Sequence, residues 1–190
     1  MKRGGQYICA ATSTGTVQLL NTKTFAVVKA WKAHMGWVHD MDANSSFLLT
    51  CGWSPRQQFG NMLDPLAKVF DLKTLMPLPP VSFQAGAAFV RMHPRMLTTA
   101  IIASQSGQLQ QVDIMNSSMV TVRQVNLVDS YLLNLDIAPS GEALALADSG
   151  CTIQLWGSPA RLSFTSYSNP TEFPDQPPTD RPSIGWKGDE

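Results

Sequence analysis

The chain alternates apolar and polar residues over many short runs. This period of two is typical of strands with one buried face. Each run is bounded by Gly, Ser, Pro, Asn or Asp, which supply turn geometry. We find no long stretch with the apolar spacing of a helix, so the pattern predicts an all-β chain. The predicted strands cover residues 7–13, 16–21, 25–31, 47–51, 67–72, 99–104, 109–114, 120–125, 132–138, 143–147 and 152–156.

Four of these strands form a repeat. The segments 15–21, 66–72, 107–114 and 151–157 alternate in the same way. Their last large apolar residues are Leu20, Phe70, Val112 and Trp156. The spacing of about 40 to 50 residues is that of a four-stranded propeller blade. Ahead of three of the four segments, an alternating strand and then a short apolar strand occur in the same order.

The repeat assigns the segment 88–94 to the innermost strand of one blade. Pro94 ends that strand, and Pro139 is its counterpart one blade later. We expect no innermost strand in the first blade, and a loop on one rim over residues 53–65. The fold class is therefore all-β: a partial WD40-type β-propeller of about four blades, the first incomplete, over residues 1–167. An extended Pro-rich linker follows over 168–190, with Pro170, Pro174, Pro177, Pro178 and Pro182.

Composition narrows the class of protein. The 14 basic residues balance the 14 acidic ones, so the chain lacks the basic excess of a dedicated nucleic-acid binder. A local basic patch stays open as an alternative to a solvated polar rim. Its candidates are Arg56, Lys68, Arg91 and Arg95, with Trp53 and Phe59 for stacking. Cys9, Cys51 and Cys151 are odd in number, which favours reduced thiols. No run reaches the length of a membrane span.

Few residues indicate chemistry. His34, His39, His93 and Cys51 lack the compact spacing of a zinc site, so we expect no metal site. Asp40 and Asp42 share one strand face, where hydrogen-bonded structural roles are favoured over acid–base work. His34, Asp148 and Trp156 are interpreted as structural blade residues: His34 precedes an innermost strand, and Asp148 lies in the turn before Trp156. No catalytic residue is predicted, and no nucleophile elbow or phosphate-binding loop occurs.

The segments "SPRQ", "LDPL", "AGAAFVRMHP" and "SGEALALADS" are more specific than a generic blade. They resemble the N-terminal WD40 propeller of catalytic subunits of Pan poly(A)-nuclease deadenylation complexes, from about His34 to Trp186. The family has a seven-bladed propeller, a linker, a pseudo-ubiquitin-hydrolase domain and a metal-dependent 3′-to-5′ exoribonuclease domain. The resemblance therefore implies that this chain is a piece of a longer protein, and no nuclease residue can be transferred to it.

The resemblance implies a function as well. We expect a scaffold module that supports poly(A)-tail shortening and mRNA decay, is not itself an enzyme and has no cofactor. The implied partners are the pseudokinase-like partner subunit and the poly(A) ribonucleoprotein, with Phe173 and Trp186 as anchors for the partner subunit. The implied location is the cytoplasm, P-bodies included, and also the nucleus, with no membrane. Two alternatives stay open: an unrelated WD40 adaptor, or the parent exoribonuclease activity.

Overall fold

The computed structural model describes residues 1–56 and 60–157. These residues form 16 strands and no helix, so none of them forms a helix that could cross a membrane. The strands are β1 (Lys2–Gly4), β2 (Tyr7–Ala11), β3 (Thr16–Asn21), β4 (Val27–Lys32), β5 (Val38–Ala43), β6 (Phe47–Arg56), β7 (Gly60–Leu63), β8 (Leu66–Asp71), β9 (Met76–Ser82), β10 (Phe89–Met92), β11 (Thr99–Ala103), β12 (Gln108–Asp113), β13 (Asn116–Gln124), β14 (Leu132–Ile137), β15 (Ala143–Asp148) and β16 (Ile153–Gly157).

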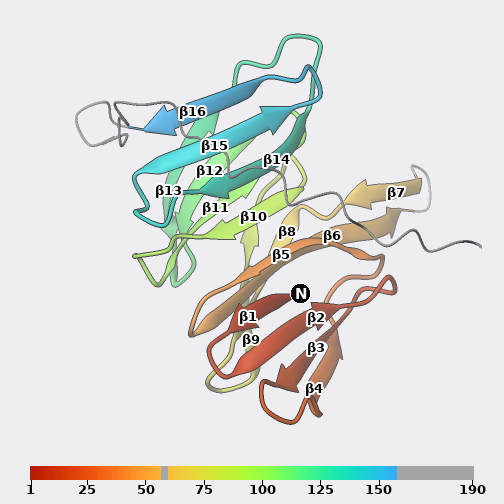
Figure 1. Ribbon diagram of the computed structural model, residues 1–190. Coiled ribbons are helices and arrows are strands. Elements are labelled where there is room, and N and C mark those ends of the chain that lie inside the picture. The colour runs from red at the N-terminus through yellow and green to blue at the C-terminus, as the bar shows by residue number, and fades with distance from the viewer. Residues whose placement is uncertain (57–59, 158–190) are drawn as a thin grey trace, which may run out of the picture.

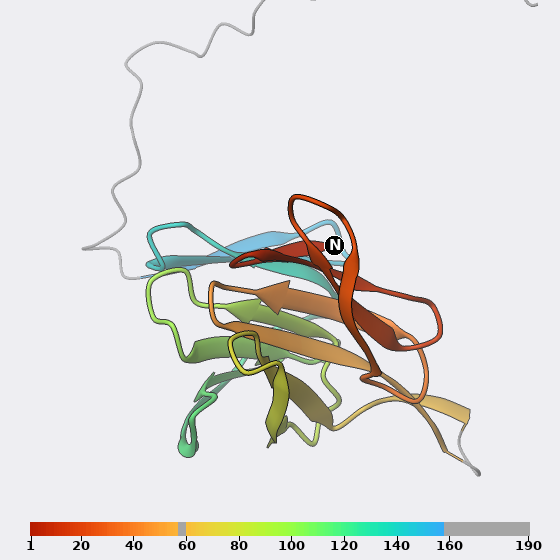
Figure 2. The same ribbon diagram turned by 90° about the horizontal axis from the view of Figure 1, so that it is seen from below.

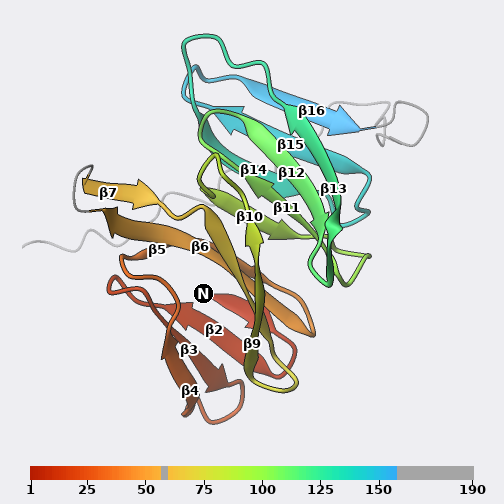
Figure 3. The ribbon, with the colours of Figure 1, turned by 180° about the vertical axis from the view of Figure 1, so that it is seen from behind.

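The strands form four antiparallel sheets, each built from consecutive strands (Figure 1). Blade I is β1-β2-β3-β4, blade II is β5-β6-β8-β9, blade III is β10-β11-β12-β13, and blade IV is β14-β15-β16. The inner strands β1, β5, β10 and β14 lie side by side in that order (Figure 1), and Figure 3 shows the succession of the four sheets from behind. The predicted all-β fold with partial propeller blades is confirmed, and the four repeat segments are the third strands β3, β8, β12 and β16.

Blade I corrects one expectation. Its innermost strand exists: β1 pairs with β2, with Lys2 opposite Cys9 and Gly4 opposite Tyr7. No pattern predicts this strand, because its three residues, Lys2, Arg3 and Gly4, show no alternation of apolar and polar side chains. The edge of β2 supplies the pairing instead. Blade IV, by contrast, has three strands among the described residues.

The expected rim loop over 53–65 is also corrected. Strand β6 continues to Arg56, and β7 folds back on it with Trp53 opposite Leu63. The hairpin β6–β7 projects beyond the sheets (Figure 2). A second strand outside the prediction is β9, which contains Pro77, Pro79 and Pro80. It is the outer strand of blade II, and an edge strand tolerates proline because one side of its ladder needs no donor.

Three hydrophobic clusters lie between the four sheets. Blades I and II bury Leu19, Leu48 and Phe70, and blades II and III bury Val69 and Ile102. Blades III and IV bury a third set, which includes Leu109, Leu132, Leu135 and Leu146. Complete burial of a leucine or isoleucine side chain contributes about 1.5 to 3 kcal/mol. The blades are therefore held together face to face, and their inner strands carry the polar groups.

Candidate functional site

Charged residues occupy one equivalent position on the four inner strands. The position is defined by the strand register: within each blade, the charged residue of the inner strand lies directly opposite one residue of the second strand, and that residue is at the same place in all four blades. The four pairs are Lys2 with Cys9, Asp42 with Leu49, Arg91 with Ile101, and Asp136 with Ala145. From blade I to blade IV the charge alternates: positive, negative, positive, negative. We call Lys2, Asp42, Arg91 and Asp136 the charge ladder.

The charge ladder links neighbouring blades. Lys2 Nζ lies 3.3 Å from Asp42 Oδ1, and Arg91 Nε lies 3.7 Å from Asp136 Oδ1. Arg91 also donates from Nη1 to Asp40 Oδ2 at 2.5 Å and from Nη2 to Asn134 Oδ1 at 3.2 Å. One arginine of blade III therefore bridges blades II and IV. Charge-assisted hydrogen bonds of this kind are roughly twice as strong as neutral ones.

Asp40 and Asp42 also bind backbone groups of the next blade. Asp40 Oδ2 accepts from the Val90 N–H at 3.1 Å, and Asp42 Oδ2 accepts from the Met92 N–H at 2.9 Å. Asp40 Oδ1 accepts from the Met41 N–H at 2.9 Å. These contacts satisfy both carboxylates with donors that belong to the fold, so the pair is built to join blades II and III.

A cavity of about 310 Å³ opens beside the charge ladder. All four ladder residues line it, together with His93 and Pro139. His93 Nδ1 accepts from the backbone N–H of Met96 at 3.0 Å, so Nε2 carries the proton and donates to Gly141 O at 3.2 Å. In the part of the chain that the structure describes, no group of three His, Cys, Asp or Glu side chains could hold a metal ion.

His34 is buried between blades I and II. Its Nε2 lies 3.0 Å from Thr50 Oγ1, and its Nδ1 lies 3.4 Å from Asp64 Oδ2. A carboxylate only accepts, so Nδ1 donates to Asp64 and Nε2 accepts from the Thr50 hydroxyl. Burial lowers the pKa of His34, although the hydrogen bond and the charge of Asp64 oppose this shift. The imidazole thus contacts two residues of blade II, while the backbone N–H of His34 donates to Gly15 O of blade I at 3.2 Å.

Asp148 ends β15 and shapes the turn to β16. Its Oδ1 accepts from Gly150 N at 2.9 Å and from Thr152 N at 3.0 Å. Thr12 and Ser104 make the same contact in blades I and III, since their hydroxyl oxygens accept from the N–H four residues later. The next position of positive φ is glycine in those two blades, Gly15 and Gly107, but Cys151, with φ of 60°, in blade IV.

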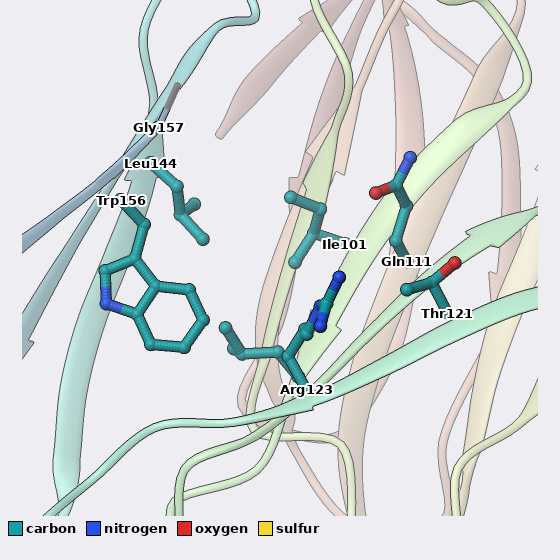
Figure 4. Close-up of a pocket in the computed structure, with 8 residues that line it drawn as sticks. Ile101, Gln111, Thr121, Arg123, Leu144, Trp156 and Gly157 are labelled. Carbon is teal, nitrogen blue, oxygen red and sulfur yellow. The ribbon is translucent and has the colours of Figure 1, made fainter. Parts of the chain in front are cut away.

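Trp156 lies in the third strand of blade IV and packs against the cluster between blades III and IV. Its Nε1 donates to Gln154 Oε1 at 3.2 Å. The indole lines a cavity of about 270 Å³ with Ile101, Gln111 and Arg123 (Figure 4). Arg123 is paired with Leu109 at the position where blade I has Trp31 paired with Val17. The Trp31 ring packs on Phe70 at a tilt of 51°, with ring centroids 4.6 Å apart.

Two of the basic side chains that are candidates for binding nucleic acid form ion pairs within the fold. Arg91 is held by Asp40, and Lys68 Nζ lies 3.9 Å from Asp64 Oδ2. Trp53 packs on Trp37 with ring centroids 5.0 Å apart and donates to His39 Nδ1 at 3.3 Å. Arg91 and Trp53 therefore serve contacts within the fold, and Phe59 lies outside the described residues.

The three cysteines are free thiols. Burial raises the pKa of Cys9 to about 11 and raises that of Cys51 further. Cys51 Sγ donates to the carbonyl of Ala88 at 3.2 Å. Cys151 is exposed. The remaining predicted site residues, Phe173 and Trp186, lie outside the described residues, as does the segment 168–190 assigned to the linker.

Sequence reasoning missed the charge ladder. The sequence pattern favours other roles for Asp42 and Arg91, and it contains no signal for Lys2 or Asp136. Aligning the inner strands by their pairing with the second strand exposes the alternation of sign. That alignment needs the register of β1, β5, β10 and β14, which bulges in β5 and β14 shift by one residue.

The sheets, their inner strands and the repeated turns define a set of WD40-type propeller blades. Residues 1–157 match the family described as PAN2 N-terminal. The chain belongs to this family.

The relatives and solved structures agree with this assignment. The chain is 58% identical over 191 residues to the PAN2-PAN3 deadenylation complex catalytic subunit PAN2 of Phaeosphaeria nodorum, a match that covers all of this chain and 17% of that protein. The same subunit of Coccidioides immitis is 53% identical, with 15% of its length covered. The Neurospora crassa Pan2 WD40 domain superposes with a TM-score of 0.78 at 44% identity, over 85% of this chain and 50% of that chain.

A more distant structure shows the fold alone. The β-propeller domain of Cps50 (Swd1) from Myceliophteria thermophila superposes with a TM-score of 0.66 at 15% identity. The chain thus corresponds to the WD40 region of deadenylase catalytic subunits and spans about one sixth of the length of the curated relatives that it matches.

Proposed function

We propose that this chain is a scaffold module of a PAN2-PAN3 deadenylation complex that supports poly(A)-tail shortening without hydrolysing RNA itself. The observation that carries the proposal is the match of residues 1–157 to the PAN2 N-terminal family, together with relatives named as catalytic subunits of that complex. The proposed partner is PAN3, and the proposed site of action is the cytoplasm, where poly(A) ribonucleoproteins are processed.

The inner strands support a binding role over turnover. Asp40 and Asp42 are the paired carboxylates that acid–base chemistry would need, and their oxygens accept from Val90, Met92 and Arg91 of the next blade. A carboxylate held by backbone N–H groups is poorly placed to take a proton from a substrate. Asp40 and Asp42 therefore hold blades II and III together.

An activity assay distinguishes a scaffold module from a nuclease. The purified chain is incubated with labelled poly(A) and Mg²⁺, and no shortening is expected. Shortening that is lost in Asp40→Ala and Asp42→Ala would make the chain a nuclease and overturn the proposal.

Partner binding is tested by calorimetry with purified PAN3. Weak binding is expected, and it should fall in Phe173→Ala and Trp186→Ala, since aromatic anchors can each contribute about 2 kcal/mol or more to an interface. Arg95→Ala serves as the matched control, because Arg95 is an exposed residue of the blade III rim. Loss of binding in the control alone would move the site to the propeller rim.

A further inference from the structure

Aromatic side chains gather at one rim of blade II, and we call Trp37, His39 and Trp53 the aromatic ridge. Trp37 and Trp53 pack on each other with ring centroids 5.0 Å apart and a tilt of 31°, and His39 lies edge-on to Trp53 at 6.0 Å. Trp37 is 39% exposed, and Met35, two residues earlier, is 70% exposed. Single exposed apolar residues are ordinary, but a packed aromatic group with an exposed ring is typical of an interaction site.

The backbone holds the two tryptophans opposite each other. The Gly36 N–H donates to Trp53 O at 2.7 Å, and the Trp53 N–H donates to Trp37 O at 3.0 Å. Trp53 lies in the part of β6 that continues past the sheet and pairs with β7, so the projecting β6–β7 hairpin supports the ridge (Figure 2). The hairpin therefore fixes Trp53, and Trp53 in turn backs the exposed ring of Trp37.

His39 adds a polar group to the ridge. Trp53 Nε1 donates to His39 Nδ1 at 3.3 Å, so Nδ1 is the acceptor and the proton of the ring is on Nε2. The imidazole also packs against Phe89 of blade III, with ring centroids 5.9 Å apart, and His39 is exposed. The ridge thus offers an N–H donor beside two stacked rings.

The charges at this rim suit an anionic ligand. Lys32 is exposed and ends β4, directly before the segment that carries Trp37. Among residues 31–56 and 60–64 no carboxylate is exposed: the three present are partly or fully buried and accept hydrogen bonds within the fold, namely Asp40, Asp42 and Asp64. A phosphate therefore meets a cation and no exposed negative charge, which favours a polyanion over a basic peptide.

We propose that the aromatic ridge binds single-stranded poly(A), with an adenine base stacked on Trp37 and a phosphate paired with Lys32. The proposal rests on the proposed function, which brings the chain to poly(A) tails. An aromatic platform and a cation are the two elements of single-strand recognition. Trp53 extends the stack behind Trp37, and His39 Nε2–H donates to the nucleotide. Stacking supplies part of the binding energy without charge, which agrees with the balanced charge of the chain.

The experiment is fluorescence anisotropy of a labelled RNA of about 12 adenosines, titrated with the full chain in the absence of Mg²⁺. We expect saturable binding. Trp37→Ala should weaken it by at least about fivefold, which corresponds to the loss of one stacked base, and Trp37→Phe should recover part of the affinity. Phe25→Ala is the matched control: Phe25 is 65% exposed in the β3–β4 turn, at the opposite end of blade I from Lys32, and its removal should leave binding unchanged.

Two further readouts keep the test independent of folding. Lys32→Gln should lower the slope of the logarithm of the binding constant against the logarithm of salt concentration by about 0.7, because one phosphate contact is lost. The RNA should quench the tryptophan fluorescence of the parent chain, and this quenching should be lost in Trp37→Ala. Circular dichroism checks the fold of each variant, and if Trp37→Ala does not fold, the salt slope of Lys32→Gln decides.

A chain that does not bind the RNA overturns the proposal, and so do equal affinities of folded Trp37→Ala and Phe25→Ala. If Trp37→Ala binds the RNA as the parent does but loses PAN3, the ridge is a protein-binding surface and the proposal is wrong. The proposed function fails on other results, namely shortening of poly(A) by the chain or no binding of PAN3. RNA binding that depends on Trp37 stands whichever way those two experiments end.

Discussion

Removal of the Asp40 carboxylate tests whether the polar contacts of the inner strands hold blades II and III together. In Asp40→Ala, the Val90 N–H and the Arg91 guanidinium lose an acceptor at 3.1 Å and 2.5 Å. The side chains of Asp40 and Arg91 are 20% and 13% exposed, so water replaces the carboxylate only in part. An unsatisfied buried donor costs about 1 to 3 kcal/mol, and breaking a buried ion pair costs about 3 to 5 kcal/mol. Allowing for the residual exposure, we expect the free energy of unfolding to fall by about 3 kcal/mol.

The assay is equilibrium urea unfolding followed by tryptophan fluorescence at low protein concentration. Asp40→Asn should cost less, about 1 to 2 kcal/mol, because the amide oxygen still accepts but the charge is gone. Asn134 holds the equivalent bulge position in blade IV and accepts from the following N–H, so the shape of asparagine fits. Asp129→Asn, at an exposed residue, is the control and should change stability little. If Asp40→Ala costs no more than this control, the inner strands are not joined by their carboxylates.

Two other predictions concern His34 and Cys151. Burial places the folded-state pKa of His34 below the ordinary value of 6.5, so the unfolded chain binds the proton more tightly and the free energy of unfolding should fall as pH drops through about 6.5. In urea titrations from pH 7.5 to about 5.5, His34→Gln should lose this pH-dependent part of the free energy of unfolding; an unchanged pH profile would contradict the assignment. Cys151→Gly should raise the melting temperature, because a residue with a side chain is strained at φ of 60° and the equivalent Gly15 and Gly107 avoid this strain. The free energy of unfolding should rise by about 0.5 to 1 kcal/mol after the entropy cost of glycine. Ser149→Gly in the same turn should instead lower the melting temperature, and the opposite order would refute the strain argument.

Much of the blade architecture could be predicted from the sequence because it is local. The third strands largely alternate apolar and polar residues, and anchors such as Phe70 and Val112 enter the core between blades. Turn residues at fixed offsets separate the strands. These features depend on neighbours within a few residues of one another, which is what a sequence pattern records.

The strands that escaped prediction lack such local signals. Lys2, Arg3 and Gly4 become strand β1 only because β2 offers a free edge. The prolines of β9 argue against a strand, yet Pro77 pairs with Phe70 at the outer edge of blade II, where a missing donor costs nothing. In both cases the position in the sheet decides, and the position becomes known only when the sheet is assembled.

The contacts between blades were beyond local prediction for the same reason. Asp40 and Arg91 are 51 residues apart, and Asn134 lies 43 residues further along the chain. Each residue alone suits a solvated rim or a binding patch equally well. Once their strands lie side by side, Asp40 accepts from Val90 and Arg91 of the next blade, and Arg91 donates to Asn134 of the blade after it. The register of the inner strands, and not the local sequence, therefore decides which of these charged side chains meet.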